Sequence, residues 1–179
     1  MIRTFVSIPV PDTPEMDSLR RELRVAGIRP SPPEQTHITL RFIGDVQESK
    51  VKRITACAER ASQGIAPFDL LVSGIGAFPN ENRPSVVWLG AEPAGTLRTL
   101  ADRLADELRR EGIGFDAKPF RAHVTVARSR DGDVPRRIFD SHRESLFSES
   151  RVDEVLVMRS DLGPGGAKHT VLARVPLQE

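Results

Sequence analysis

The chain has 179 residues, of which 39% are hydrophobic and 28% charged, and its formal net charge is +1. This composition is typical of a globular protein with a buried core, and the small net charge excludes a strong overall field that would draw the chain to nucleic acid. A single cysteine, Cys57, excludes an intrachain disulfide, and no apolar stretch is long enough to cross a membrane.

The first half of the chain alternates between strand and helix patterns. The run Asp12-Thr13-Pro14 combines an N-cap candidate with a proline in the first turn and predicts a helix start, and Gly27 predicts the end of that helix. Several prolines then predict a loop. In chain order we expect strand 4–10, helix 12–27, loop 28–35, strand 36–42, helix 45–64 and strand 68–78. Gly74 and Gly76, within the last of these strands, predict a bulge or a close backbone approach.

The second half repeats this alternation. Leucines at helical spacing from Leu97 to Leu108 mark the buried face of one long helix, which ends at Gly112. In chain order we expect turn 79–84, strand 86–89, helix 94–111, strand 118–127, loop 129–134, helix 135–142, strand 152–158, loop 161–166 and strand 170–175. The length of the chain favours one domain, or two small lobes, over residues 1–179.

The order of these elements indicates an internal duplication. The opening strands of the halves, at Phe5 and Val87, are 87 − 5 = 82 residues apart, and the strands at Phe68 and Val152 are 152 − 68 = 84 apart. A histidine strand recurs at nearly the same interval. Such a repeat predicts two lobes related by approximate two-fold symmetry, with the two histidines near the axis.

Two strands carry the same histidine–aliphatic–threonine–aliphatic motif. His37 and Thr39 lie in one of them, and His123 and Thr125 lie in the other, 123 − 37 = 86 residues later. Residues i and i+2 of a strand share a face, so each motif presents an imidazole and a hydroxyl together while its aliphatic residues are buried. A histidine pair can hold one neutral and one protonated ring near neutral pH, which suits general acid–base cleavage of a phosphodiester.

Three arginines complete the predicted phosphate site. Alternation along the strands places Arg41 beside Thr39 and Arg121 beside His123, and Arg128 stands at the end of the second motif strand. Arginine suits phosphate because its planar guanidinium donates two parallel hydrogen bonds. We expect Lys118, Arg130 and Lys168 at the rim of the site.

Other interpretations of these residues remain open. The two motifs could be structural cross-strand pairs, or the histidines could bind a metal, although His142 and His169 have no ligand spacing and no acidic residues cluster near the motifs. We therefore expect no metal and no cofactor. The run Gly163–Gly166 lacks the lysine of a phosphate-binding loop and predicts a mobile lid or a hairpin turn. We expect Phe42, Trp88 and Cys57 in the core.

The motifs resemble those of the two-histidine (2H) phosphoesterases, and within them the RNA 2',3'-cyclic phosphodiesterases, also called 2'-5' RNA ligases. Further segments along nearly the whole chain are similar to that family: Phe5–Pro9, His37–Gly44, Gly76–Pro79, Val87–Gly90 and Phe120–Arg128. Two positions depart from the family pattern. Ala122 stands where a proline is usual, and Lys168-His169-Thr170 occupies a region of the last strand that often has a tyrosine.

The resemblance implies a bilobal α+β fold in which two antiparallel sheets line a central cleft, with helices outside. It implies metal-free opening of a 2',3'-cyclic phosphate at an RNA 3' end to a 2'-phosphate, and reversible joining of RNA ends through a 2'-5' bond. Carried over by residue, His37 is expected to donate a proton to the departing O3', His123 to activate water, and Thr39 and Thr125 to hold the phosphate.

The resemblance leaves more than one substrate class open. The expected partners are tRNA-like or short RNAs with a cyclic-phosphate end, and we expect a monomer without membrane association. A small cyclic nucleotide or an ADP-ribose cyclic phosphate is an alternative substrate, and a non-catalytic protein that binds RNA ends is an alternative of another class. The chain starts without the apolar core of a signal peptide, so we expect a cytoplasmic location.

Overall fold

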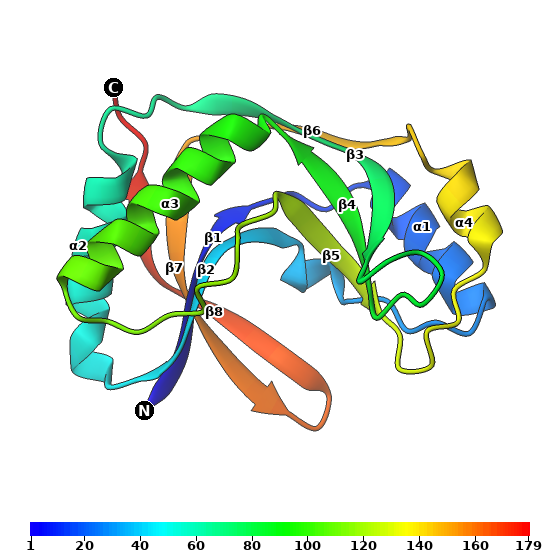
Figure 1. The fold of residues 1–179 in the computed structure, drawn as a ribbon, viewed down its shortest axis with the longest axis horizontal. Helices are drawn as coiled ribbons and strands as arrows, with labels where there is room; N and C mark the ends of the chain where they lie inside the picture. Colours follow the sequence, from blue (N-terminus) through cyan, green and yellow to red (C-terminus); the bar gives the residue numbers. More distant parts are fainter.

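A computed structural model describes residues 1–179. The chain forms two four-stranded antiparallel sheets with helices outside (Figure 1). The predicted α+β class, with two sheets lining a cleft, is confirmed. The first sheet has the order β2 (His37–Val46), β1 (Ile2–Pro9), β7 (Glu154–Gly163), β8 (Gly166–Pro176). The second sheet has the order β5 (His123–Arg128), β4 (Val86–Glu92), β3 (Phe68–Phe78), β6 (Leu146–Val152).

The helices form where the sequence patterns predict them. In α1 (Pro14–Val25) the Thr13 hydroxyl accepts a hydrogen bond from the backbone N–H of Met16 at 3.2 Å, and the chain leaves the helix through Gly27 at φ +81°. The other helices are α2 (Val51–Ser62), α3 (Ala94–Arg110) and the short α4 (Arg136–Ser141). No helix has both the length and the apolar character needed to cross a membrane.

Each lobe contains segments from both halves of the chain. Helices α2 and α3 pack against each other and on the first sheet, whereas α1, from the first half, packs on β6 of the second sheet with α4 beside it (Figure 1). Strand β3, also from the first half, pairs with β4 and β6, and β7, from the second half, pairs with β1. The sequence halves are therefore interleaved, and one core of 42 buried hydrophobic residues includes side chains of both sheets.

Two glycines of β3 explain how its neighbours pack. Gly74 has φ +73° and lies at a register shift between Ser73 and Ile75, which is the predicted bulge. Gly76 lies under the Trp88 ring, where an added Cβ would come within 2.3 Å of a ring carbon. The Trp88 ring in turn contacts Phe78 at a centroid distance of 5.4 Å. Because Gly76 has no side chain, the Trp88 ring can lie directly over it and pack against Phe78 beside the central cleft.

The structure differs from the predicted elements at four places. The first motif strand continues to Val46, so the next α-helix begins at Val51 and not at residue 45. The segment Leu146–Val152 forms an edge strand that the sequence analysis did not predict, because most of its residues are polar. The second motif strand begins only at His123, because residues 114–122 run as an irregular segment. The expected loop 161–166 is the tight turn of a long hairpin, since β7 continues to Gly163 and β8 resumes at Gly166. Of the two alternatives for this segment, the hairpin turn is the one observed.

Candidate active site

The two motif strands contain a β-bulge at the same position. In β2, Arg41 pairs with Val6 and Thr39 with Ser7, so Leu40 has no partner. In β5, the register likewise skips Val126, so in both strands the bulged residue is the third after the histidine. A bulge places two successive side chains on one face and reverses the alternation beyond it. The shared bulge supports the duplication more directly than the similarity of the two motif sequences.

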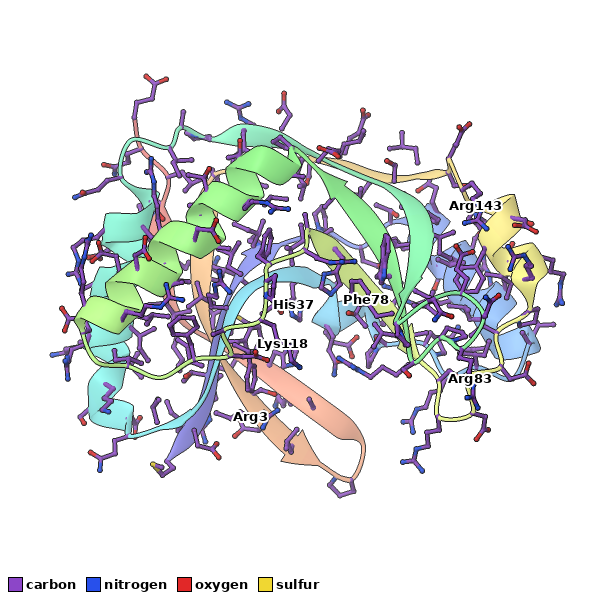
Figure 2. All side chains as sticks on the ribbon, in the orientation of Figure 1. Arg3, His37, Phe78, Arg83, Lys118 and Arg143 are labelled. Atoms are coloured by element: carbon purple, nitrogen blue, oxygen red, sulfur yellow. The ribbon has the colours of Figure 1, made fainter.

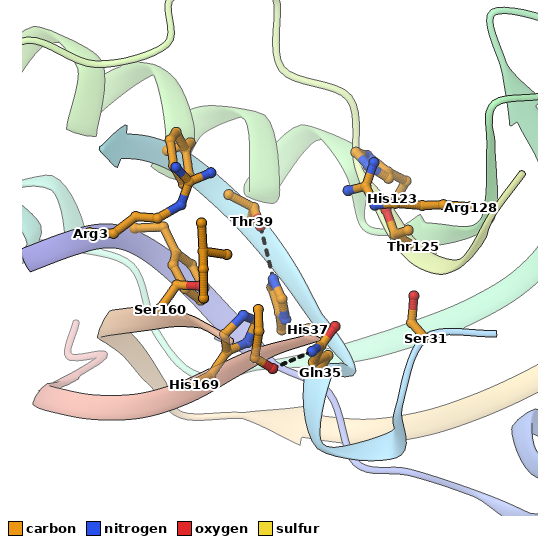
Figure 3. A pocket seen from close by; sticks show the side chains of 14 residues that line it. Arg3, Ser31, Gln35, His37, Thr39, His123, Thr125, Arg128, Ser160 and His169 are labelled. Atoms are coloured by element: carbon orange, nitrogen blue, oxygen red, sulfur yellow. Dashed lines mark hydrogen bonds between the residues drawn. The ribbon is translucent and has the colours of Figure 1, made fainter. Parts of the chain in front are cut away.

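The bulges determine which later side chains face the cleft. Arg41 and Ala127, directly after the bulged residues, are buried, and the next residues, Phe42 and Arg128, return to the motif face. We define the central pocket as the cavity of about 480 Å³ between the two sheets. Its lining includes both motif histidines and threonines: Arg3, Phe5, Ser31, Gln35, His37, Thr39, Phe42, His123, Thr125, Arg128, Ser160, Leu162, Ala167 and His169 (Figure 3).

A backbone carbonyl orients the imidazole of His123. The Nδ1 of His123 lies 2.7 Å from the carbonyl oxygen of Arg121, and the backbone of Gln35, also two residues upstream of its histidine, acts to raise the pKa of His37. A carbonyl only accepts, so the Nδ1 of His123 carries a proton and its Nε2 is left for chemistry. The Nε2 of His37 lies 3.0 Å from the hydroxyl of Thr39.

A phenylalanine packs against each histidine ring. Phe5 contacts His37, and Phe78 contacts His123 edge to face, both at a centroid distance of 5.1 Å. Figure 2 shows His37 and Phe78 in the central region between the two lobes, far from peripheral side chains such as Arg143. These rings restrict the imidazoles and keep bulk water from one side of each.

Burial lowers the pKa of every histidine in the central pocket. The pKa of His37 falls to about 4, first because its ring is desolvated and second because His169 and His123 are nearby positive charges when protonated. Desolvation also lowers the pKa of His123, with smaller contributions from Arg128 and Arg121. Desolvation lowers the pKa of His169 as well. An anion bound among these rings would stabilise their protonated forms.

Arg41 does not lie in the pocket, and its expected position beside Thr39 is wrong. Its side chain is 7% exposed and turns to the opposite face of β2, because the bulge at Leu40 reverses the alternation. All three of its guanidinium nitrogens are engaged: Nε with the carbonyl of Ala101 at 3.0 Å, Nη1 with that of Lys118 at 3.0 Å, and Nη2 with the Asp102 carboxylate at 3.2 Å. Arg41 thereby connects β2 to α3 and to the loop before β5.

The other predicted arginines differ in position. Arg128 lines the central pocket, and its side chain forms no ion pair or hydrogen bond within the chain. The side chain of Arg121 is not part of the lining. It is exposed, with its guanidinium 5.7 Å from the centroid of the Phe78 ring, and only its carbonyl contributes to the site through His123.

The expectation that Phe42 belongs to the core is also wrong. Phe42 lines the central pocket, and the guanidinium of Arg3 lies 4.5 Å above its ring centroid. Trp88 is only partly buried, whereas Cys57 is fully buried as expected. No three histidine, cysteine, aspartate or glutamate side chains come together in an arrangement that could hold a metal ion.

Comparisons with known proteins agree with this geometry. The model of the 2'-5' RNA ligase superfamily matches residues 8–164, which is most of the chain. The chain belongs to this superfamily. An RNA 2',3'-cyclic phosphodiesterase of Archaeoglobus fulgidus is 36% identical over 92% of this chain and 94% of its own length, and one of Thermus thermophilus is 34% identical over 99% and 91%. The crystal structure of Escherichia coli LigT complexed with 3'-AMP superposes with a TM-score of 0.76, at 27% identity and 99% coverage of both chains.

Several pocket residues of this superfamily member were not predicted from the sequence. The sequence indicates no metal-ligand spacing for His169 on β8 and predicts no site role for it, yet its ring lies 5.4 Å from that of His37 and 4.9 Å from that of Phe5. The available signal was its position in the last strand, where the family often has a tyrosine. Gln35 and Ser31 lie in the proline-rich loop and its short helix, and no motif marks them. Arg3 and Ser160 come from β1 and β7.

Proposed function

We propose that this protein hydrolyses 2',3'-cyclic phosphates at RNA 3' ends to 2'-phosphates, and that it can join RNA ends reversibly through a 2'-5' bond. The observation that carries the proposal is the convergence of two His-x-Thr strands on one pocket, with the His123 imidazole held by a backbone carbonyl and the His37 imidazole in contact with the Thr39 hydroxyl. Membership in the 2'-5' RNA ligase superfamily and the relatives named RNA 2',3'-cyclic phosphodiesterase support it.

The proposed reaction uses the two histidines as a general acid–base pair. The Nε2 of His123 takes a proton from water, the resulting hydroxide attacks phosphorus, the P–O3' bond breaks, and the Nε2 of His37 gives its proton to O3'. One water is consumed, and the phosphate stays on O2'. Because the pKa of His37 is about 4 in the free protein, its acid form would be populated mainly once the anionic phosphate has bound beside it.

Three side chains are proposed to hold the phosphoryl oxygens. The hydroxyls of Thr39 and Thr125 lie on the same strand faces as the histidines, and Arg128 contributes an unpaired positive charge next to the second motif. When substrate enters, the Thr39 hydroxyl would exchange its contact with His37 for a non-bridging oxygen. Donors fixed before the reaction stabilise the charge that develops on those oxygens.

The far wall of the pocket suits a nucleobase. Phe42 and Arg3 provide an aromatic and a guanidinium surface, on which bases stack without strong sequence preference. This wall would accept the terminal base of an RNA, but it would equally accept the base of a small cyclic nucleotide. We include in the proposal that the protein acts as a monomer in the cytoplasm, and that its substrates are tRNA-like or short RNAs.

The decisive experiment is incubation with a short RNA that ends in a 2',3'-cyclic phosphate, in the presence of EDTA. Phosphorus NMR of the product should show a 2'-monophosphate, and the His37→Ala and His123→Ala variants should leave the substrate intact. A 3'-phosphate product would refute the assigned leaving group. Activity lost in EDTA and restored by a divalent ion would refute the metal-free mechanism. Binding without turnover would favour the non-catalytic RNA-end binder.

A further inference from the structure

A second cavity lies directly beside the central pocket. It encloses about 830 Å³ and shares Ser31, Gln35, Arg128 and Ala167 with the pocket, so the two cavities adjoin, and we call them together the channel. Figure 3 shows Ser31 and Arg128 at one end of the pocket and Arg3 at the other, with His37 between them. We call this second cavity the basic groove. It is lined by residues 26–32, Gln35, residues 128–131, Asp133 and residues 165–167.

The walls of the basic groove are held in place by hydrogen bonds. The backbone N–H of Ser31 donates to the carbonyl of Val126 at 2.7 Å, which fixes the proline-rich loop to the second motif strand. The side chain of Gln35 donates to the carbonyl of Ala167 at 2.6 Å. This bond connects the proline-rich loop to the start of β8, at the point where the pocket and the groove meet. The groove is therefore formed before any ligand arrives.

The charges in the groove are free to bind a ligand. Arg29, Arg128 and Arg130 are exposed, and none forms an ion pair or a side-chain hydrogen bond, whereas most other arginines of the chain are paired with carboxylates. Asp131 and Asp133 also line the groove but pair with none of these arginines. Three unpaired guanidinium groups along one channel are the arrangement expected for successive phosphates.

We propose that the basic groove binds the RNA backbone immediately 5' of the reacting end, with Arg29 and Arg130 contacting phosphates upstream of the one held by Arg128. This inference rests on the proposed function, and it makes an RNA end, rather than a small cyclic nucleotide, the preferred substrate. The channel also sets the direction of the strand. The terminal base lies toward Phe42 and Arg3, and the preceding nucleotides pass Gln35 into the groove.

The proposal predicts that substrate length matters only through the groove. For a longer RNA, the Arg29→Ala/Arg130→Ala double variant should raise KM by roughly fivefold for each arginine, the size of an exposed charge pair, and leave kcat unchanged. For a nucleoside 2',3'-cyclic phosphate, which has no upstream phosphate, both constants should stay at the wild-type values. Asp131→Asn, which removes a negative charge from the same groove, should lower KM for the longer RNA only.

The experiment measures kcat and KM for both substrates across a salt series, with Arg98→Ala as the control. Arg98 is an exposed arginine of α3 without an ion pair, and it lies outside the channel. The longer RNA should show a log–log salt slope steeper by about 0.7 for each added phosphate contact, and the double variant should abolish the difference.

The outcomes separate this inference from the proposed function. If the wild type opens neither cyclic phosphate, the proposed function fails. If it opens both with the same KM and salt slope, or if the double variant affects both lengths alike, the groove does not bind RNA and the inference is overturned. A length-dependent loss in the double variant, together with normal kinetics of Arg98→Ala, supports it.

Discussion

Replacing Arg41 by methionine should destabilise the fold and leave catalysis intact. The guanidinium of Arg41 is buried and donates to two carbonyls and one carboxylate, all outside the central pocket. A residue that bound phosphate would show the opposite behaviour, because its loss would weaken substrate binding without changing stability. Arg128, which is exposed and unpaired on the pocket wall, is the matched comparison.

The expected size follows from the three contacts of Arg41. The bond to the Ala101 carbonyl is fully buried and comes from a charged donor, and such a bond is worth about 1.5–3 kcal/mol. The bonds to the Lys118 carbonyl and Asp102 are partly exposed, so water can replace them and each counts for about 0.5–1 kcal/mol. Methionine keeps much of the apolar packing. The free energy of unfolding should fall by about 2.5–5 kcal/mol, which corresponds to roughly 5–20 °C in Tm for a chain of this length.

Urea denaturation and steady-state kinetics on a cyclic-phosphate RNA test this prediction together. Below its unfolding transition, Arg41→Met should keep the wild-type kcat/KM. Arg128→Met should unfold like the wild type but lose roughly tenfold or more in kcat/KM, the usual worth of a charged hydrogen bond. A stable Arg41→Met protein with strongly reduced activity would refute the structural role and restore the arginine to the phosphate site.

The remaining predictions concern the motif residues. His37→Ala and His123→Ala should each lower kcat by about 10²-fold or more, and the double variant should be little worse than either, because the pair acts as a unit. Thr39→Val and Thr125→Val should lower kcat more than they raise KM if the hydroxyls bind the transition state more strongly than the substrate, and steady-state kinetics distinguish the two effects. Burial, followed by the charges of neighbouring histidines, lowers the pKa of His37 from 6.5 when unfolded to about 4 when folded, so the unfolded chain binds that proton more tightly. The free energy of unfolding should therefore fall as pH decreases from about 6.5 to 4, and His37→Phe should show a weaker pH dependence in urea titrations; equal slopes would contradict it.

The sequence predicted the two motifs well because their information is local. The two strands carry the same residue types, and the buried and exposed positions alternate up to Thr39 and Thr125 as the strand period requires. The helix from Thr13 to Gly27 was equally predictable, since its cap, first-turn proline and terminal glycine are all adjacent in sequence. The two sheets followed from the family resemblance and from the repeated order of elements.

The errors arose where position depends on a partner strand. The bulges at Leu40 and Val126 exist only in the register with β1 and β4, so alternation alone placed Arg41 in the pocket and Phe42 in the core. His169 reaches His37 because of the path of the β7–β8 hairpin, and no residue near it in sequence indicates that contact. The basic groove likewise combines loops more than 100 residues apart, from residues 26–32 and 165–167.

The interleaving of the two lobes limits how this protein can move. The backbone passes from one lobe to the other six times: between β1 and α1, α1 and β2, α2 and β3, β4 and α3, α3 and β5, and β6 and β7. Domain closure around a hinge needs only a few connections that bend together, and six separate crossings resist such a rotation. The two histidines, which lie in different sheets, are therefore held at a nearly constant separation. A substrate must therefore fit a gap whose width the fold sets in advance.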